Sequence, residues 1–186
     1  MIPVCSKALL EICTVMLALA CARAQALELS REEVLNTFKI FEQHEYGIAM
    51  LDVDQDGDLD CLTARRTEFD EDAPSATYVW QLKGLNGKEK REIIFHFKPG
   101  PTPDQAIFTL DDTDGTEHLL KTLYTDYHAC ALLQLPYAGR EECMLWVTEE
   151  SKNNVPETCV DQFRQHCGVE VVAYDEDTCS QLEDNR

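Results

Sequence analysis

The stretch CMLWVTEESKNNVPETCVDQF, residues 143–163, joins a strand-like run to the start of a helix and holds a cysteine in each. Its first five residues are apolar, as in a buried strand. Pro156 is typical of the first turn of a helix, so we predict a helix over residues 156–166. Further cysteines lie on both sides of the stretch: Cys61, Cys130, Cys167 and Cys179. An even set of six cysteines in an exported chain indicates disulfide bonds.

The N-terminus predicts export. Lys7 precedes an apolar run over residues 12–22, and two overlapping small-x-small cleavage sites follow. This pattern indicates a secretory signal peptide over residues 1–24, with cleavage at residue 26 as a variant, and the run is too short to span a bilayer. We therefore expect a secreted, extracellular protein, and a retained N-terminal helix is the alternative. Cleavage reduces the nine cysteines to six by removing Cys5, Cys13 and Cys21.

The remaining residues, 25–186, are predicted to form a single domain, because no repeat, linker or change of composition divides them. The whole chain has 35 acidic and 16 basic residues and a net charge of −19 at pH 7. Such a charge repels nucleic acid and anionic membranes, so we expect neither as a partner. It attracts cations, including amines and metal ions, although acidity by itself also serves solubility.

The order of predicted elements is one helix, many short strands and one helix. Ser30 and Glu33 form a capping box, and apolar residues follow at helical spacing, so a helix is predicted over residues 30–44. Turn signals such as Asn86-Gly87 then separate short strand-like runs. The pattern favours a mainly β fold, a closed antiparallel barrel around a cavity, with a sandwich as the alternative. The eight predicted strands are 47–53, 59–67, 76–83, 91–98, 105–111, 117–126, 129–135 and 142–148.

Three phrases carry a resemblance to a known family. They are Tyr124-Thr125-Asp126-Tyr127-His128-Ala129-Cys130, Cys143-Met144-Leu145-Trp146, and Asn154-Val155-Pro156 leading to Cys159 and Phe163. In these phrases the chain resembles the tick salivary lipocalins, which include the histamine-binding proteins of tick saliva. The resemblance implies an eight-stranded lipocalin-type barrel with an N-terminal helix and a C-terminal helix packed outside. It also implies sequestration of small host mediators, such as biogenic amines or leukotrienes.

The resemblance implies three disulfides as well. Together with the cysteine spacing, it pairs Cys61 with Cys179, Cys130 with Cys159, and Cys143 with Cys167. The first would tie the C-terminal tail to the start of the second strand. The other two would hold the second helix against adjacent strands.

The candidate ligand-binding residues lie on several predicted strands. Phe108 and Trp146 match family positions that line the cavity, and His118 follows the Asp114-Gly115 turn on a strand opposite Phe108. Ligand pockets are mainly apolar with a few placed polar groups, which suits these side chains. For each aromatic residue, ordinary core packing is the alternative. The full candidate set is Phe108, Trp146, Leu110, His118, Tyr124 and Asp52.

The chain departs from the amine-binding motif of the family. Amine-binding relatives carry an acid directly after the cysteine corresponding to Cys130 and another two residues before the tryptophan. Here Ala131 and Met144 stand at those positions. A buried ammonium needs a carboxylate to offset its desolvation, so we expect an apolar or weakly polar mediator rather than histamine. An amine held by other acids is the alternative.

Residues 52–60 read DVDQDGDLD, which matches a calcium-loop pattern through its ninth position. The twelfth position is Thr63 instead of the bidentate glutamate, and a strand-like run precedes the loop instead of a helix. We therefore predict an acidic turn between strands that does not bind calcium tightly, and no metal site.

No enzymatic site is predicted. The five histidines have no zinc-type spacing, no G-x-S-x-G occurs, and the six cysteines are expected to be oxidised. We expect no catalytic residues and no cofactor. Two functions stay open: a scavenger of small amine or lipid mediators, and a protein-binding inhibitor of host defence directed at complement or haemostasis.

Overall fold

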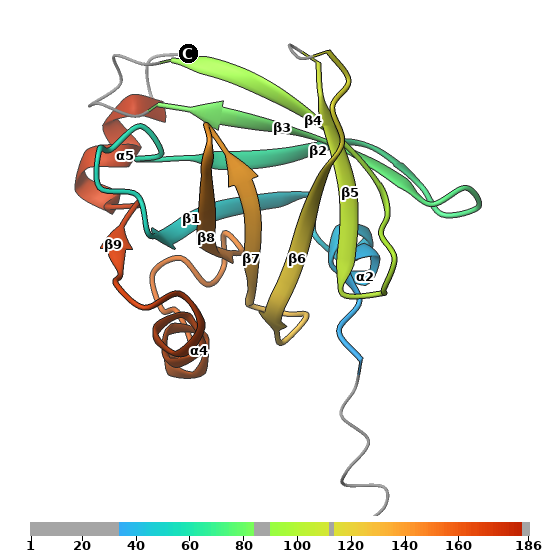
Figure 1. Cartoon of the computed structure of the whole chain (residues 1–186). Coiled ribbons are helices and arrows are strands. Elements are labelled where there is room, and N and C mark those ends of the chain that lie inside the picture. Colours follow the sequence, from blue (N-terminus) through green and yellow to red (C-terminus); the bar gives the residue numbers. More distant parts are fainter. Residues whose placement is uncertain (1–33, 84–89, 112–113, 184–186) are drawn as a thin grey trace, which may run out of the picture. The chain divides into compact units, whose positions relative to one another are not determined.

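Eight antiparallel strands close into a barrel in the computed structural model, which describes residues 34–83, 90–111 and 114–183 (Figure 1). Each of the eight strands pairs with the next one along the chain. The last strand, β8, pairs with β1, and this pairing closes the barrel. The predicted mainly β, eight-stranded barrel is confirmed. The strands are β1 (Tyr46–Asp52), β2 (Thr63–Asp70), β3 (Ser75–Leu82), β4 (Arg91–Pro99), β5 (Gln105–Leu110), β6 (His118–Thr125), β7 (Cys130–Tyr137) and β8 (Arg140–Val147).

The barrel is filled by side chains that alternate along the strands. On β4, Ile93, Phe95 and Phe97 are buried while the residues between them are more exposed, the pattern of a strand with one face in a core. We call this inward-facing set the interior cluster. Its larger members include Trp80, Phe95, Phe97, Phe108, Met144 and Trp146.

Strands β7 and β8 are apolar on both faces. Ala131 and Leu133 belong to the interior cluster, whereas Leu132 and Leu145 belong to a second group outside the barrel. A strand buried on both faces reads as a nearly continuous apolar run, which explains the sequence of this region. We call the second group the outer cluster, and its members include Ile48, Leu132, Leu145, Cys159, Phe163 and Tyr174.

Helix α4 (Glu157–Cys167) packs outside the barrel, as predicted. Pro156 is its N-cap residue, and Cys159 and Phe163 are its buried side chains. Two elements were not predicted: β9 (Val171–Val172), which pairs with the end of β1, and helix α5 (Glu176–Glu183). No helix in the described part of the chain is long and apolar enough to cross a membrane.

Helix α2 (Thr37–Gln43) lies at one end of the barrel, with Ile40 and Phe41 buried in the interior cluster (Figure 1). It is shorter than the predicted helix over residues 30–44. Asn36 is its N-cap, and the Asn36 side chain accepts a hydrogen bond from the Lys39 N–H at 3.1 Å. The described residues before Thr37 are not helical. The predicted capping box and signal peptide lie outside the described residues, as does the Asn86-Gly87 turn.

The second strand begins later than predicted. Residues 59–62 form a turn, and β2 starts at Thr63. Cys61 has a positive φ of 58°, and its N–H donates to the carbonyl of Ala173 at 2.7 Å. This conformation takes Cys61 out of the strand ladder and turns it toward the C-terminal segment.

Three disulfides join the barrel to the C-terminal third. They are Cys61–Cys179, Cys130–Cys159 and Cys143–Cys167, the same pairs that the family resemblance implies. Two of them attach α4 to β7 and β8, and the third attaches α5 to the turn before β2. The outer cluster is therefore crosslinked as well as packed.

Candidate functional site

A cavity of about 80 Å³ lies at the barrel end that α2 covers. Ile40, Phe41 and His44 contribute to it from α2 and the residue after it, and Tyr46 and Gly47 from the start of β1. The far walls are the inward faces of β3, β7 and β8. A helix across the mouth of a small barrel therefore makes one wall of the pocket, where such barrels hold small ligands.

Two tryptophans form the aromatic wall. The Trp80 and Trp146 rings lie with their centroids 5.5 Å apart, and both line the cavity. Gly47 makes room for this arrangement, because a Cβ atom at that position would lie 3.3 Å from the ring of Trp146. The indole of Trp146 thus lies directly against the backbone of β1.

Trp146, which lines the cavity, carries a hydrogen-bond donor that no described residue uses. The Nε1–H of Trp146 is buried and has no hydrogen-bond partner among the described residues, and the side chain is only 7% exposed. Nearby polar groups are already engaged. Tyr78 donates its hydroxyl to the carbonyl of His44, and the Nε2 of His44 pairs with the carbonyl of Tyr127 at 3.1 Å. A buried donor without a partner is costly, so Trp146 is suited to a ligand that brings an acceptor.

No aspartate or glutamate of the described residues lines the cavity. Ala131 is part of its wall, and Met144 is fully buried in the interior cluster. The two positions that lack the family's acids are therefore both inside the barrel. A bound ammonium would lose water here without gaining a carboxylate.

The structure places Trp146 alone, among the six candidate ligand residues, on the cavity wall. Phe108 lies one layer behind, with its ring 5.7 Å from that of Phe97, a lining residue. His118 faces Phe108 across the β5–β6 pair and packs on its ring at 5.3 Å. The histidine that lines the cavity is His44, which is not among the candidates predicted from the sequence.

Leu110, Tyr124 and Asp52 lie away from the cavity. Leu110 is partly buried at the edge of the interior cluster. Tyr124 packs against the outer cluster, because a bulge between Thr122 and Tyr124 shifts the alternation of β6. Asp52 is at the far end of β1, so none of these three contacts the cavity wall.

A group of carboxylates, some buried and some exposed, surrounds Asp52 at that other end of the barrel. Arg140 bridges several of them: its Nη1 lies 2.8 Å from Asp56, its Nη2 3.1 Å from Asp54, and its Nε 3.1 Å from Glu142. We call the group the acidic cluster, and its members are Asp52, Asp54, Asp56, Asp58 and Glu142.

Burial and mutual repulsion alter the acidity of this cluster. Burial, with the neighbouring charge of Asp54, raises the pKa of Asp52 to about 7. The same two causes raise the pKa of Asp58 to about 6. These raised pKa values indicate that Arg140 alone does not offset the negative charge of the carboxylates.

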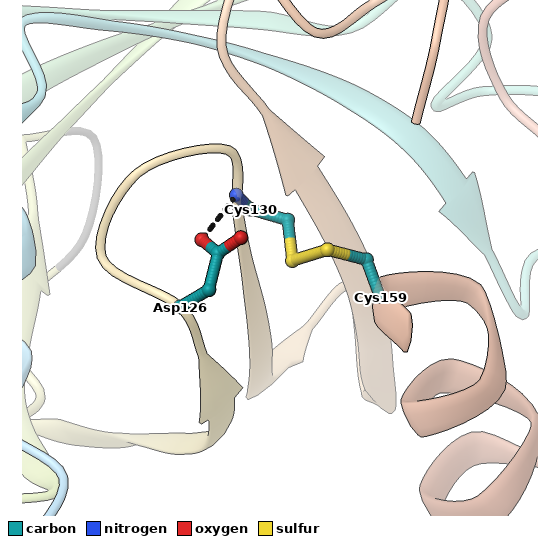
Figure 2. Close-up of side chains that lie close together, drawn as sticks. All are labelled: Asp126, Cys130 and Cys159. Atoms are coloured by element: carbon teal, nitrogen blue, oxygen red, sulfur yellow. Dashed lines mark hydrogen bonds between the residues drawn. A yellow bond between two sulfur atoms is a disulfide. The ribbon is translucent and has the colours of Figure 1, made fainter. Parts of the chain in front are cut away.

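The loop between β6 and β7 is organised by Asp126 (Figure 2). Its Oδ1 accepts backbone hydrogen bonds from His128, Ala129 and Cys130 at 2.8–3.0 Å. Cys130 and Cys159 are also near Asp126, but their sulfurs are joined in a disulfide and are not available to a metal ion. The arrangement holds the loop whose Ala129 and Cys130 reach the cavity.

We expect Asp126→Asn to destabilise the fold by about 1 kcal/mol at neutral pH, because it weakens these charge-assisted hydrogen bonds. Burial alone would raise the pKa of Asp126, but the N–H groups of Cys130, His128 and Ala129 outweigh it and lower the pKa below 3.8. The stabilisation is therefore present above pH 3.8 and disappears as the pH falls through the lowered value. Urea unfolding of both proteins over this range tests it, and a pH-independent difference would contradict it.

The chain is similar to known proteins in sequence and in structure. The family model described as "Tick histamine binding protein" matches residues 40–181. Among solved structures, the AM182 serotonin complex is 15% identical, with a TM-score of 0.59 over 77% of this chain and 92% of that one. Lobster apocrustacyanin A1 is 12% identical, with a TM-score of 0.51 over 73% and 78%.

The cockroach allergen Per a 4 is also similar, at 12% identity and a TM-score of 0.51 over 79% of this chain and 94% of that one. At these identities the structures share the fold. A comparison with curated proteins found no significant match.

Proposed function

Because the chain belongs to the tick histamine-binding protein family, we propose that it is a secreted scavenger that holds one small host mediator in the cavity under α2. Sequestration of such a mediator would serve evasion of host defence. The proposal includes removal of residues 1–24, or cleavage at residue 26, which leaves the lipocalin domain. It assigns no catalytic role and no cofactor to the chain.

The observation that carries the proposal is the buried, unpaired Nε1–H of Trp146, a residue that lines a mainly apolar pocket. A ligand with an oxygen acceptor at this point would satisfy the donor, while its ring or chain packs between Trp80 and Phe97. An ammonium gains no carboxylate there. The chemistry therefore favours a neutral aromatic or apolar ligand that carries one acceptor.

The size of the cavity favours a compact ligand over a long lipid. It measures about 80 Å³, and one water needs roughly 10–15 Å³ on this kind of measure, so the space fits roughly five to eight water-sized groups. An acyl chain would have to displace aromatic side chains such as Phe97. We therefore rank a compact mediator first, with one ring or with two rings and some movement of the lining side chains, and leukotriene-like lipids second.

A matched pair of ligands tests this ranking. Serotonin is one, since the AM182 structure is a serotonin complex, and 5-hydroxytryptophol is the other, since a hydroxyl replaces the ammonium on the same ring system. We expect the neutral analogue to bind at least about tenfold more tightly, a difference of about 1.4 kcal/mol. Calorimetric titration of the mature chain with both, beside histamine, a leukotriene and arachidonate, measures it. Tight histamine binding with no response to the neutral analogue would contradict the proposal.

A protein-binding inhibitor is the second candidate, favoured by how fully the barrel is packed. Phe95 and Phe108 are at most 1% exposed in the interior cluster, and they take up space that larger ligands need. An inhibitor of complement or haemostasis would bind through its loops and need no cavity. This function would be supported if the whole ligand panel failed and the immobilised chain retained a complement or clotting protein from host plasma.

A further inference from the structure

We propose that the loop between β1 and β2 and the side chain of Glu142 on β8 form a binding site for one divalent cation, with Ca²⁺ as the best-fitting ion. The site lies at the opposite end of β1 and β8 from the cavity. Along β8 it is four residues from Trp146, or about 13 Å. The inference is therefore independent of the proposed scavenger function.

The loop carboxylates converge on one point. Asp54, Asp56 and Asp58 each offer an oxygen, and these atoms lie within 4.8 Å of one another. Calcium binds oxygens at about 2.3–2.6 Å, so two ligands on opposite sides of one ion are roughly 5 Å apart. Three oxygens within 4.8 Å of one another can all reach a single calcium ion.

Two buried carboxylate oxygens of the acidic cluster accept no hydrogen bond from the described residues. They are Oε2 of Glu142 and Oδ1 of Asp58. Glu142 is only 1% exposed, and its other oxygen accepts from Arg140, the same side chain that binds the loop carboxylates. An ionised oxygen in such surroundings needs a donor or a cation. No described residue donates a hydrogen bond to either oxygen, and Arg140 Nη2 lies 3.7 Å from Asp58 Oδ1.

Arg140 neutralises part of the negative charge that a bound cation would neutralise. Its Nη2 lies 3.1 Å from Asp54 Oδ1 and 3.7 Å from Asp58 Oδ1, so it competes for the oxygens that would bind the ion. It brings one positive charge to a cluster of five carboxylates. Its side chain is 43% exposed, so the guanidinium can move into solvent and leave the oxygens to a doubly charged ion.

Glu142 is the ligand that would replace the one that the loop sequence lacks. Its oxygens are not among the three that already lie within 4.8 Å of one another, and it would reach the ion once Arg140 moves away. Thr63 stands at the twelfth loop position, and that absence is why the sequence predicts no tight calcium binding. In the structure, β8 brings a buried glutamate to the same cluster from a distant part of the chain. Ca²⁺ accepts a flexible shell of six to eight oxygens, whereas Mg²⁺ requires strict octahedral geometry, so calcium suits carboxylates from two separate elements better.

Calcium titration of the chelator-treated, disulfide-intact chain tests the site. We expect one ion per chain, with a dissociation constant of about 10⁻⁴ M or tighter at physiological ionic strength, and weaker binding of Mg²⁺. Glu142→Gln should weaken calcium binding at least about tenfold, because it keeps the shape but removes the charge. Arg140→Gln should strengthen it, because it removes the competing guanidinium. The matched control is Glu141→Gln, an exposed acid next in the strand, which should change nothing.

Three results would overturn the proposal. The first is no saturable calcium binding by the unaltered chain. The second is equal binding by the unaltered chain and Glu142→Gln, which would indicate diffuse attraction to an acidic surface. The third is weaker binding after Arg140→Gln. If Glu142→Gln does not fold, Asp58→Asn on the partly exposed loop takes its place, and unchanged calcium binding by that variant counts equally against the site.

Discussion

Replacing both Cys61 and Cys179 with alanine is expected to lower the free energy of unfolding by about 4–5 kcal/mol. The disulfide closes a separation of 118 residues, and both cysteines are at most 3% exposed. In the chain-entropy description, a crosslink restricts the unfolded chain more as the loop lengthens. The variant should keep the barrel and unfold at lower denaturant concentration.

The control for this variant is the pair Cys143→Ala and Cys167→Ala. That disulfide closes only 24 residues, and the same description gives about 3 kcal/mol for its loss. Guanidinium unfolding followed by circular dichroism gives both values. Equal losses, or a larger loss for the shorter loop, would show that loop closure is not what this disulfide contributes.

Phe163→Ala is expected to cost about 3–5 kcal/mol of stability. Phe163 on α4 has no exposed surface and packs in the outer cluster against β7 and β8. Its removal leaves a cavity that the crosslinked helix cannot easily close, because the disulfides of Cys159 and Cys167 hold α4 in place. The same unfolding measurement applies.

His166→Ala is the matched control, since His166 is exposed on the same helix and its loss should change stability by no more than about 0.5 kcal/mol. A loss below about 1 kcal/mol for Phe163→Ala would mean that α4 contributes little to the packed structure. The barrel would then be stable without its outer cover.

The strands and both main helices could be predicted from local signals, and their misplaced ends have local causes. The strands from β3 to β6 follow period-two alternation and turn residues, and β7 and β8 read as apolar runs, all of which are visible in one sequence. The start of β2 was misplaced because Cys61 adopts a positive φ for a tertiary contact with Ala173. The predicted start of α2 was too early. Ser30 and Glu33 match the two-residue capping-box pattern, which is a stronger signal in the sequence than the single N-cap residue Asn36.

Only part of the candidate site could be predicted. The place of Trp146 in the cavity wall could be predicted from the family resemblance of residues 143–146. Phe41 and His44 reach the cavity from α2 and the residue after it, and no local pattern shows where that helix packs. A usable signal existed for Tyr78, which shares the period-two face of β3 with Trp80. Tyr124 was misassigned because the β6 bulge reverses its face, and a bulge leaves no mark in its sequence.

The acidic cluster shows the same limit. The loop carboxylates are adjacent in sequence, so their convergence could be anticipated from spacing. The contributions of Arg140 and Glu142 could not, because the closure of β8 onto β1 brings them there. A judgement based on the loop alone therefore omitted both Arg140 and Glu142.

The most direct test of the central claim uses the tryptophans. The chain has two, and both line the cavity, so a bound molecule must alter their fluorescence. In Trp80→Phe the emission comes from Trp146 alone. Titration of this variant with 5-hydroxytryptophol, excited at wavelengths where the ligand correction is small, is predicted to give a saturable change at one ligand per chain. Calorimetric binding with no change in Trp146 emission would place the ligand elsewhere and contradict the account.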